Sequence, residues 1–175
     1  LHLPFQSGSS RVLKAMNRHY DRETYLEKVH YAKSVMPDLV LTSDVIVGFP
    51  GETEEEFEES RAFVDKVNFY ETHIFKYSRR AGTKADRMEN QIPESIKTER
   101  SNVLLDLNAK KMEMYEQALM GTKQEVLMEE SIEINGETYQ VGHTKEYVKI
   151  AYKSEENLSN QIVFVELANR SQIIH

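Results

Sequence analysis

The sequence contains no cysteine among its 175 residues. The chain itself therefore cannot form a disulfide, offer a thiolate nucleophile, or bind zinc or an iron–sulfur cluster through sulfur. It also lacks any apolar run near the roughly 20 residues that a membrane-spanning helix needs, and no basic-then-apolar signal segment opens it. We expect a cytoplasmic protein with no membrane partner, and any sulfur-ligated cluster must have its ligands outside this sequence.

Positive charge is also in short supply, because the formal net charge is −7. Phosphate binding is mostly electrostatic, so this balance argues mildly against a nucleic-acid partner. A composition of 39% hydrophobic and 29% charged residues is ordinary for a globular protein. The first residue is Leu1, and Leu1 to Phe5 resembles the end of a strand already under way, so we expect a piece of a longer protein.

The clearest structural unit runs from residue 39 to the helix that follows Thr53. Leu39 to Val47 is rich in β-branched residues, which indicates a buried strand of the kind found in parallel sheets. Gly48, Pro50 and Gly51 end that strand, and Thr53 with Glu56 forms a capping box that starts a helix. Ligands of parallel α/β folds bind in the loops that follow such strands.

The loop after Phe5 has the same form, with a short helix behind it. The purely structural interpretation is a turn with a hydroxyl N-cap, and the residue pattern alone favours it. The functional interpretation is a polar loop in which Gln6, Ser7 and Ser9 offer hydrogen-bonding groups and Gly8 lets a ligand approach the backbone.

A third unit consists of a strand over Tyr70 to Tyr77 and a basic loop over Ser78 to Thr83. Arg79 and Arg80 in this loop are either surface charges or contacts to an anion such as phosphate, for which the planar guanidinium is well suited. Composition alone leaves the two interpretations evenly balanced.

Two further helices are indicated by apolar side chains at helical spacing. Asp21 caps the first, whose stripe is Tyr25, Val29, Ala32 and Met36. The second begins at Pro93 and ends at Gly121, and we expect it to close a first domain over residues 1–120. Its stripe consists of Val103, Leu104, Leu107, Met114, Tyr115 and Ala118.

After Gly121 the apolar period changes to that of short strands. Five runs are expected to form a small all-β barrel over residues 121–175, and Asn135-Gly136 indicates a hairpin between two of them. The runs are residues 126–128, 132–134, 139–141, 147–150 and 162–165. Such barrels often bind oligonucleotides, and here aromatic and basic side chains could stack on bases and meet phosphates. The candidates are Tyr147, Tyr152, Lys145, Lys149 and Lys153. The alternative is a structural barrel with aromatic core residues.

Three segments together resemble one known family, the tRNA methylthiotransferases of the radical S-adenosylmethionine (SAM) superfamily. They are Leu3-Pro4-Phe5-Gln6-Ser7-Gly8-Ser9 with Val12-Leu13-Lys14-x-Met16-Asn17-Arg18, then Asp44-Val45-Ile46-Val47-Gly48-Phe49-Pro50-Gly51-Glu52-Thr53, then Tyr77-Ser78-x-Arg80-x-Gly82-Thr83. The tail, with Gly142-His143-Thr144-x-x-Tyr147-Val148-Lys149-Ile150, resembles the RNA-binding TRAM domain of that family. The segment His73 to Arg80 is more similar to the branch acting on N6-threonylcarbamoyladenosine at position 37 of tRNA than to the isopentenyladenosine branch.

The resemblance implies an α/β fold, namely the C-terminal part of a partial (βα) barrel followed by a small OB-like TRAM barrel. It implies SAM as a cofactor, [4Fe-4S] clusters in the intact protein, and the tRNA anticodon stem-loop as a partner. The family's Cys-x-x-x-Cys-x-x-Cys loop is absent, so no catalytic residue is assigned and this piece alone should be inactive.

The resemblance also implies two sets of site residues. The implied cofactor contacts are Gln6, Ser7, Ser9, Val45, Ile46 and Gly48. The implied RNA contacts are Arg79, Arg80, His143, Lys145, Tyr147 and Lys149. Two rival hypotheses are a different barrel enzyme with a similar half, and a stand-alone RNA-binding module without activity.

Overall fold

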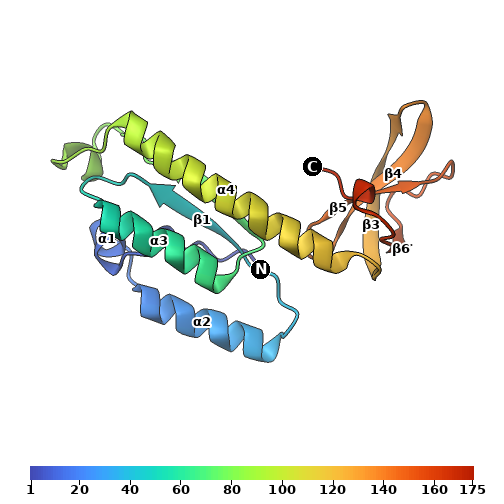
Figure 1. The fold of residues 1–175 in the computed structure, drawn as a ribbon, viewed down its shortest axis with the longest axis horizontal. Coiled ribbons are helices and arrows are strands. Elements are labelled where there is room, and N and C mark those ends of the chain that lie inside the picture. Colours follow the sequence, from blue (N-terminus) through green and yellow to red (C-terminus); the bar gives the residue numbers. More distant parts are fainter. The chain divides into compact units, whose positions relative to one another are not determined.

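The computed structural model describes residues 1–175, which form two compact units, Leu1–Met112 and Glu113–His175. The first unit holds a two-stranded parallel sheet and the second a curled, four-stranded antiparallel sheet (Figure 1). The predicted fold class, an α/β region followed in the sequence by a smaller β unit, is confirmed. No helix of the chain has both the length and the apolar character of a membrane span.

The first unit alternates helices and parallel strands. Its elements are α1 (Ser10–Ala15), α2 (Arg22–Val35), β1 (Thr42–Val47), α3 (Glu54–Val67), β2 (Glu71–Lys76), η1 (Ala85–Arg87) and most of α4 (Glu94–Leu119). β1 and β2 pair in register from Thr42 with Glu71 to Val47 with Lys76. The chain before α1 runs parallel to β1 through bridges at His2–Thr42 and Gln6–Val45. The predicted strand end at Leu1–Phe5 is therefore a bridged segment and not a full strand.

Local hydrogen bonds begin the helices where the sequence predicts. The Ser9 hydroxyl accepts from the Val12 amide at the start of α1, and the Asp21 carboxylate accepts from the Thr24 amide at the start of α2. Thr53 and Glu56 form the reciprocal capping box of α3. These caps satisfy amides that have no partner within the helix, so each boundary follows from nearby residues.

The helices of the first unit cover one face of the sheet. Ser43, Val45 and Val47 of β1 are buried, and the residues between them are only partly buried. Under this face Phe5 stacks on Phe63 with ring centroids 4.4 Å apart, and Leu104 of α4 is buried in the same core. The opposite face carries residues that are exposed or only partly buried, namely Thr42, Asp44, Ile46, Glu71, His73 and Phe75.

The predicted helix stripes are only partly correct. On α2, Tyr25 and Val29 are buried, but Met36 is 47% exposed because it is the C-cap residue, where the backbone has left helical geometry. On α4, Leu104 is buried, whereas Val103 and Met114 are exposed. The stripes therefore mark the correct faces but run too far along both helices.

The second unit contains four strands and not the predicted five. They are β3 (Lys123–Ile134), β4 (Glu137–Thr144), β5 (Lys149–Lys153) and β6 (Ile162–Glu166), in the order β5-β4-β3-β6. The first two predicted runs form the single strand β3, because a bulge between Met128 and Glu130 carries the polar residues between them through the ladder.

Two turns of the second unit have left-handed backbone conformations. Asn135 and Gly136 have φ values of 53° and 80° and form the predicted hairpin. Tyr147, predicted to begin a strand, lies instead in the turn before β5 with a φ of 71°. This positive φ is uncommon for a residue with a large side chain.

Candidate functional site

A cleft of about 510 Å³ opens at the ends of β1 and β2. Its lining comes from the end of α1, from both strands and from the loops that follow them. The lining residues are Met16, Arg18, Ile46, Phe49, Phe75, Lys76, Tyr77, Ser78, Arg80, Thr83 and Ala85. This is the carboxyl edge of a parallel sheet, where α/β folds bind their ligands.

The charge of the cleft is positive. Arg18 and Arg80 line it and neither forms an ion pair within the chain, whereas Lys76 lies 2.6 Å from the Glu94 carboxylate. No Asp or Glu is among the lining residues. Two guanidinium groups without acidic partners give the cleft the character of an anion site, suited to phosphate or carboxylate oxygens.

The aromatic side chains of the cleft offer both stacking area and an unused donor. Phe75 is 52% exposed, and Phe49 meets the Tyr77 ring edge-on with centroids 5.3 Å apart. The Tyr77 hydroxyl is buried without a hydrogen-bond partner. Because buried hydroxyls are normally paired, Tyr77 is left with an unused hydrogen-bonding group on a residue that lines the cleft.

Lys97 of α4 holds the loops after both β1 and β2, a contribution that sequence reasoning missed. The Lys97 ammonium donates to the Tyr77 carbonyl at 2.9 Å, and a side-chain carbon at position 48 would lie 2.4 Å from the Lys97 Cγ. Gly48 is therefore required twice, for this close approach and for its φ of 73°. No sequence pattern singles out Lys97, because a lysine on a helix is normally solvated.

A buried ion pair fixes the same loop. The Glu52 carboxylate accepts from the Gly48 amide at 2.7 Å and from the Arg100 guanidinium at 2.7 Å. Arg100 also reaches Glu54 at 2.9 Å. Burial raises the pKa of Glu52, and the bonds from Gly48 and Arg100 oppose that shift. Glu52 thus ties the strand end to α4 and does not face the cleft.

The serines predicted as cofactor contacts use their hydroxyls inside the protein. Ser7 lies 3.3 Å from the Ser60 hydroxyl, and Ser9 donates to Glu56 at 3.1 Å. Gly8 donates its amide to Ser60 at 2.8 Å and lies too close to α3 for a side chain. Both serines therefore hold the loop against α3, and neither lines the cleft.

The remaining predicted cofactor residues occupy different surroundings. Ile46 lines the cleft, whereas Val45 is fully buried in the helix-covered core. Gln6 has a φ of 75° and bonds through its backbone to Asp44 and Ile46. Its side-chain amide makes no hydrogen bond within the chain, although the residue is only 6% exposed. None of these findings tests whether the six residues contact a cofactor, so their role stays a prediction.

Glu56 is the most strongly perturbed acid near this loop. Arg11 donates to its carboxylate, and this bond lowers the pKa of Glu56 to about 2. The capping bond from the Thr53 amide and the bond from Ser9 act in the same direction. Glu56 is consequently ionised at any physiological pH and fastens α1 to α3.

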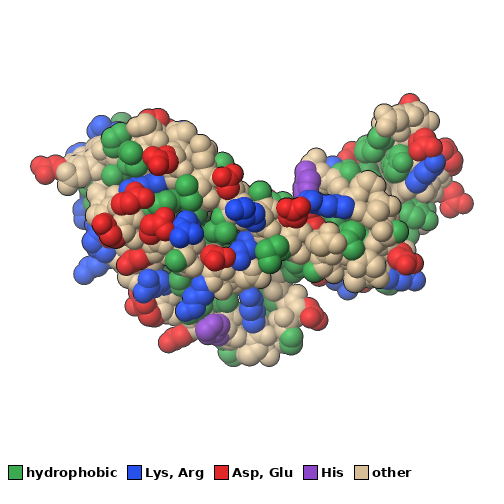
Figure 2. Space-filling model, viewed as in Figure 1, with side chains coloured by type: hydrophobic (Ala, Val, Ile, Leu, Met, Phe, Trp, Pro, Cys, Tyr) green, Lys and Arg blue, Asp and Glu red, His purple; other side chains and the backbone are tan.

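The predicted RNA contacts differ in how their charges are balanced. Arg79 donates to the Asp86 carboxylate at 2.9 Å, unlike its neighbour Arg80. In the second unit, Lys145 lies 2.7 Å from Glu125 and Lys149 lies 3.6 Å from Glu130. Acidic and basic side chains are likewise interspersed on the face drawn in Figure 2. An RNA phosphate would have to displace these acids.

An aromatic pair stands beside those lysines. The His143 and Tyr147 rings stack with centroids 4.8 Å apart, and Tyr147 is 77% exposed. His143 also lies 2.8 Å from the Glu129 carboxylate. The outer face of Tyr147 is open, so this pair presents a surface on which a base could stack.

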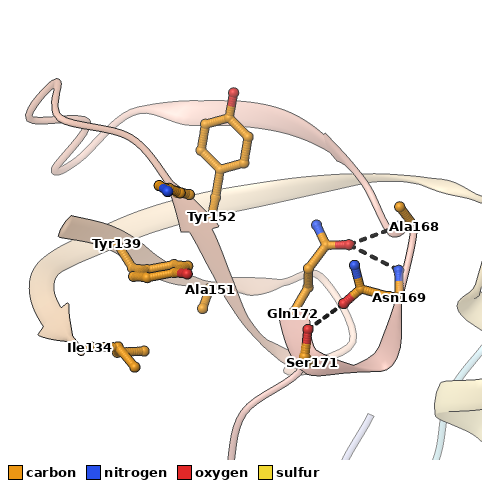
Figure 3. A pocket seen from close by; sticks show the side chains of 9 residues that line it. Ile134, Tyr139, Ala151, Tyr152, Ala168, Asn169, Ser171 and Gln172 are labelled. Atoms are coloured by element: carbon orange, nitrogen blue, oxygen red, sulfur yellow. Dashed lines mark hydrogen bonds between the residues drawn. The ribbon is translucent and has the colours of Figure 1, made fainter. Parts of the chain in front are cut away.

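The second unit also contains a pocket that sequence reasoning did not predict. It measures about 490 Å³ and lies between Tyr139, Tyr152 and the turn after β6 (Figure 3). The Gln172 side-chain oxygen closes that turn by accepting from the Ala168 amide at 2.8 Å and the Asn169 amide at 3.1 Å. Some of the residues that line the pocket are more than 30 positions apart in the sequence, so no local sequence pattern predicts it.

Comparison with known proteins agrees with these features. Residues 1–64 match the Radical SAM superfamily. The chain is 44% identical, over 95% of its length and 37% of the relative, to a tRNA-2-methylthio-N(6)-dimethylallyladenosine synthase of Clostridium perfringens. It is 42% identical, with the same coverage, to the threonylcarbamoyladenosine tRNA methylthiotransferase MtaB of Bacillus subtilis. It is also 43% identical to a synthase of the first kind from Aquifex aeolicus, over 98% of this chain and 38% of that relative. The chain thus spans little more than a third of the length of these relatives.

Proposed function

We propose that this chain, whose resemblance to radical SAM tRNA methylthiotransferases is confirmed along 95% of its length, forms the substrate-facing part of such an enzyme. The reaction is the attachment of a methylthio group to C2 of a modified adenosine at position 37 of cytoplasmic tRNA. The observation that carries the proposal is the cleft at the ends of β1 and β2, with Arg18 and Arg80 free of acidic partners.

The iron–sulfur chemistry must come from outside these residues. Cluster ligation needs thiolates, and the chain has no cysteine, so its own residues do not fit a cluster. Bound SAM would supply the radical chemistry of the intact enzyme once a cluster is provided. The chain's own part is placement of the cofactor and the tRNA.

The Gln6 loop and the cleft have separate tasks in this proposal. Gln6 offers its uncommitted amide to the polar end of SAM, and Ser7 and Ser9 hold the Gln6 loop against α3. Ile46 lines the apolar side against which the adenine packs, Gly48 follows the end of the same strand, and Val45 supports the strand from the core.

Arg18 and Arg80 face the tRNA backbone in the same proposal. Neither guanidinium group has an ion pair that must be broken before it binds a phosphate, so no such cost reduces the binding free energy. Phe75 and the unpaired Tyr77 hydroxyl offer stacking and a hydrogen bond to the target base.

The second unit is proposed to add a weak contact to the anticodon stem-loop. Tyr147 and His143 would stack on an exposed base, while Lys145 and Lys149 exchange their acidic partners for phosphates. Stacking should outweigh charge here, because the cations are already neutralised.

We further propose the threonylcarbamoyladenosine branch, on the similarity of the His73 to Arg80 segment to that branch. Both branches occur among the similar proteins, so the branch has to be identified from the modified nucleoside in tRNA. The test is deletion of the gene that encodes this chain, followed by mass spectrometry of nucleosides from total tRNA. Loss of the methylthio form of threonylcarbamoyladenosine alone is expected, and loss of only the dimethylallyl form would assign the other branch.

Complementation of the deletion separates this proposal from a non-catalytic RNA-binding role. A gene carrying Arg80→Ala should restore little of the modification, while Arg61→Ala, which removes an exposed arginine on α3, should restore it fully. If the deletion leaves both methylthio nucleosides unchanged, the chain is not part of a methylthiotransferase.

A further inference from the structure

Three metal-binding side chains meet on the face of the sheet that the helices leave uncovered. His2 comes from the bridged N-terminal segment, Asp44 from β1 and His73 from β2, and each offers a ligand atom within 4.8 Å of the others. We propose that these three residues bind one divalent transition-metal ion, with Zn²⁺ and Co²⁺ as the probes. The proposal concerns the chain itself and does not depend on the proposed function.

The parallel register brings the three residues together. His2 is bridged to Thr42, two positions before Asp44, and Asp44 pairs directly with His73. Side chains alternate between the faces of a strand, so Asp44 points away from the buried Ser43 and Val45. The three ligands thus come from three neighbouring segments, the bridged N-terminal segment, β1 and β2, whose pairing fixes their register.

The distances suit a small ion. The His2 Nε2 lies 3.4 Å from the Asp44 Oδ2. Two ligands about 2.0–2.1 Å from a tetrahedral zinc ion are about 3.4 Å apart, so this pair already has the required separation. The two imidazole rings have centroids 5.8 Å apart, and His73 is on the surface, where a small side-chain rotation can close the third side.

A neighbouring hydroxyl orients the first histidine. The His2 Nδ1 lies 2.9 Å from the Thr42 hydroxyl, which leaves Nε2 directed at Asp44. Metal-binding histidines commonly bond through the other ring nitrogen in this way. The Glu71 carboxylate lies 3.9 Å from the His73 Nδ1, which is too far for a hydrogen bond but gives the second ring an acidic neighbour.

The ligand set selects the class of ion. Two imidazoles and one carboxylate suit Zn²⁺, Co²⁺, Ni²⁺ or Fe²⁺, and they disfavour Mg²⁺ and Ca²⁺, which prefer oxygen ligands. Three protein ligands on a half-exposed surface leave at least one position for water or another small ligand, as in catalytic zinc sites.

The test uses the purified chain with any affinity tag removed. Calorimetric titration with ZnCl₂ should show one ion per chain, and CoCl₂ should give the visible absorption of a low-coordinate Co²⁺ site. Asp44→Ala and His73→Ala should each weaken binding more than roughly tenfold, because even outer-shell changes typically cost that much. His143→Ala is the matched control, because His143 also lies beside a carboxylate but has no third ligand.

Two outcomes would overturn the proposal. One is Zn²⁺ binding that Asp44→Ala and His73→Ala leave unchanged, which would indicate chelation by the N-terminal amine and His2 alone. The other is the absence of any 1:1 binding by the parent chain. Should either variant unfold, NMR of the parent chain decides instead: the imidazole signals of His2 and His73 must shift together with one equivalent of Zn²⁺.

Discussion

Both units present basic and aromatic side chains, but they differ in whether the basic side chains form ion pairs. The first unit leaves Arg18 and Arg80 without acidic partners around a cleft, whereas the second pairs Lys145, Lys149 and Lys153 each with a glutamate. An unpaired cation can bind a phosphate without losing an existing partner, and a paired one cannot. Under the proposed function, this difference assigns phosphate binding to the cleft and leaves the second unit to contribute mainly by stacking.

Each unit also buries one glutamate beside an arginine, with a different exposure of the arginine. The Glu52 and Arg100 side chains are 1% and 6% exposed, whereas Glu116 is fully buried and its partner Arg170 is 47% exposed. The first pair is sealed under the loop after β1. The second ties the turn after β6 to the end of α4, within reach of water.

Removing the two arginines tests this contrast and should give the largest effects. Arg100→Ala leaves Glu52 buried without a counter-charge and should lower the free energy of unfolding by about 3–5 kcal/mol. Arg170→Ala should cost only about 1–2 kcal/mol, because water can replace the half-exposed guanidinium. Urea unfolding measures both, with hydrogen exchange assigning each loss to its unit. Equal losses would contradict the contrast, and Glu52→Gln with Arg100→Met should recover part of the first loss.

Loss of a cleft cation should matter more for RNA than loss of a paired one. Arg80→Ala should weaken binding of an anticodon stem-loop by about tenfold, the effect of one charge-assisted contact. Lys149→Ala should change it by no more than about twofold, because Lys149 already neutralises Glu130. Fluorescence anisotropy at low salt compares the two, and a reversed order would place charge recognition in the second unit.

Acid should weaken the Gln6 loop in a defined pH range. The pKa of Glu56 is lowered from an ordinary 4.5 to about 2, mainly by Arg11. A lowered pKa stabilises the fold above pH 4.5, and this contribution is lost as the pH falls from 4.5 towards 2. We expect about 1–2 kcal/mol, allowing for solvent screening at the half-exposed Arg11. Thermal unfolding of Glu56→Gln should lack this step, and an unchanged pH profile would refute the assignment.

The smallest effect concerns the turn that presents Tyr147. Its φ of 71° favours glycine, so Tyr147→Gly should stabilise the second unit by about 0.5–1 kcal/mol. The same change removes the stacking surface and should weaken RNA binding. A variant that gains stability and keeps its affinity would show that Tyr147 does not contact the base.

The parts of the fold that depend on near neighbours were predictable from the sequence. The caps at Ser9, Asp21 and Thr53 involve residues three positions away, and the Asn135-Gly136 hairpin needs only its own two residues. The parallel type of the sheet followed from the β-branched run at Leu39 to Val47, although in β2 only Thr72 is buried. The predicted number of strands was wrong because the polar residues at the Met128/Glu130 bulge, which lie inside β3, resemble a turn in the sequence.

The candidate site was less predictable, because its geometry depends on distant residues. Lys97 and Arg100 reach loops about 20 and 48 positions away, and only the packing of α4 brings them there. Strand register places a glutamate beside Lys145 and another beside Lys149. The sequence does not show these pairs, so both lysines seemed free to bind phosphate. The meeting of His2, Asp44 and His73 likewise requires three segments to be in register.

The salt dependence of tRNA binding shows whether Arg18 and Arg80 are the residues that contact phosphate. For the parent chain, two phosphate contacts at Arg18 and Arg80 predict a log–log slope of roughly −1.4 to −1.8 against salt concentration, from about −0.7 to −0.9 per phosphate. The Arg18→Ala, Arg80→Ala double variant should have a slope near zero, while Lys145→Ala, Lys149→Ala should keep the parent slope. A slope that is unchanged in the first double variant and near zero in the second would place the phosphate contacts in the second unit.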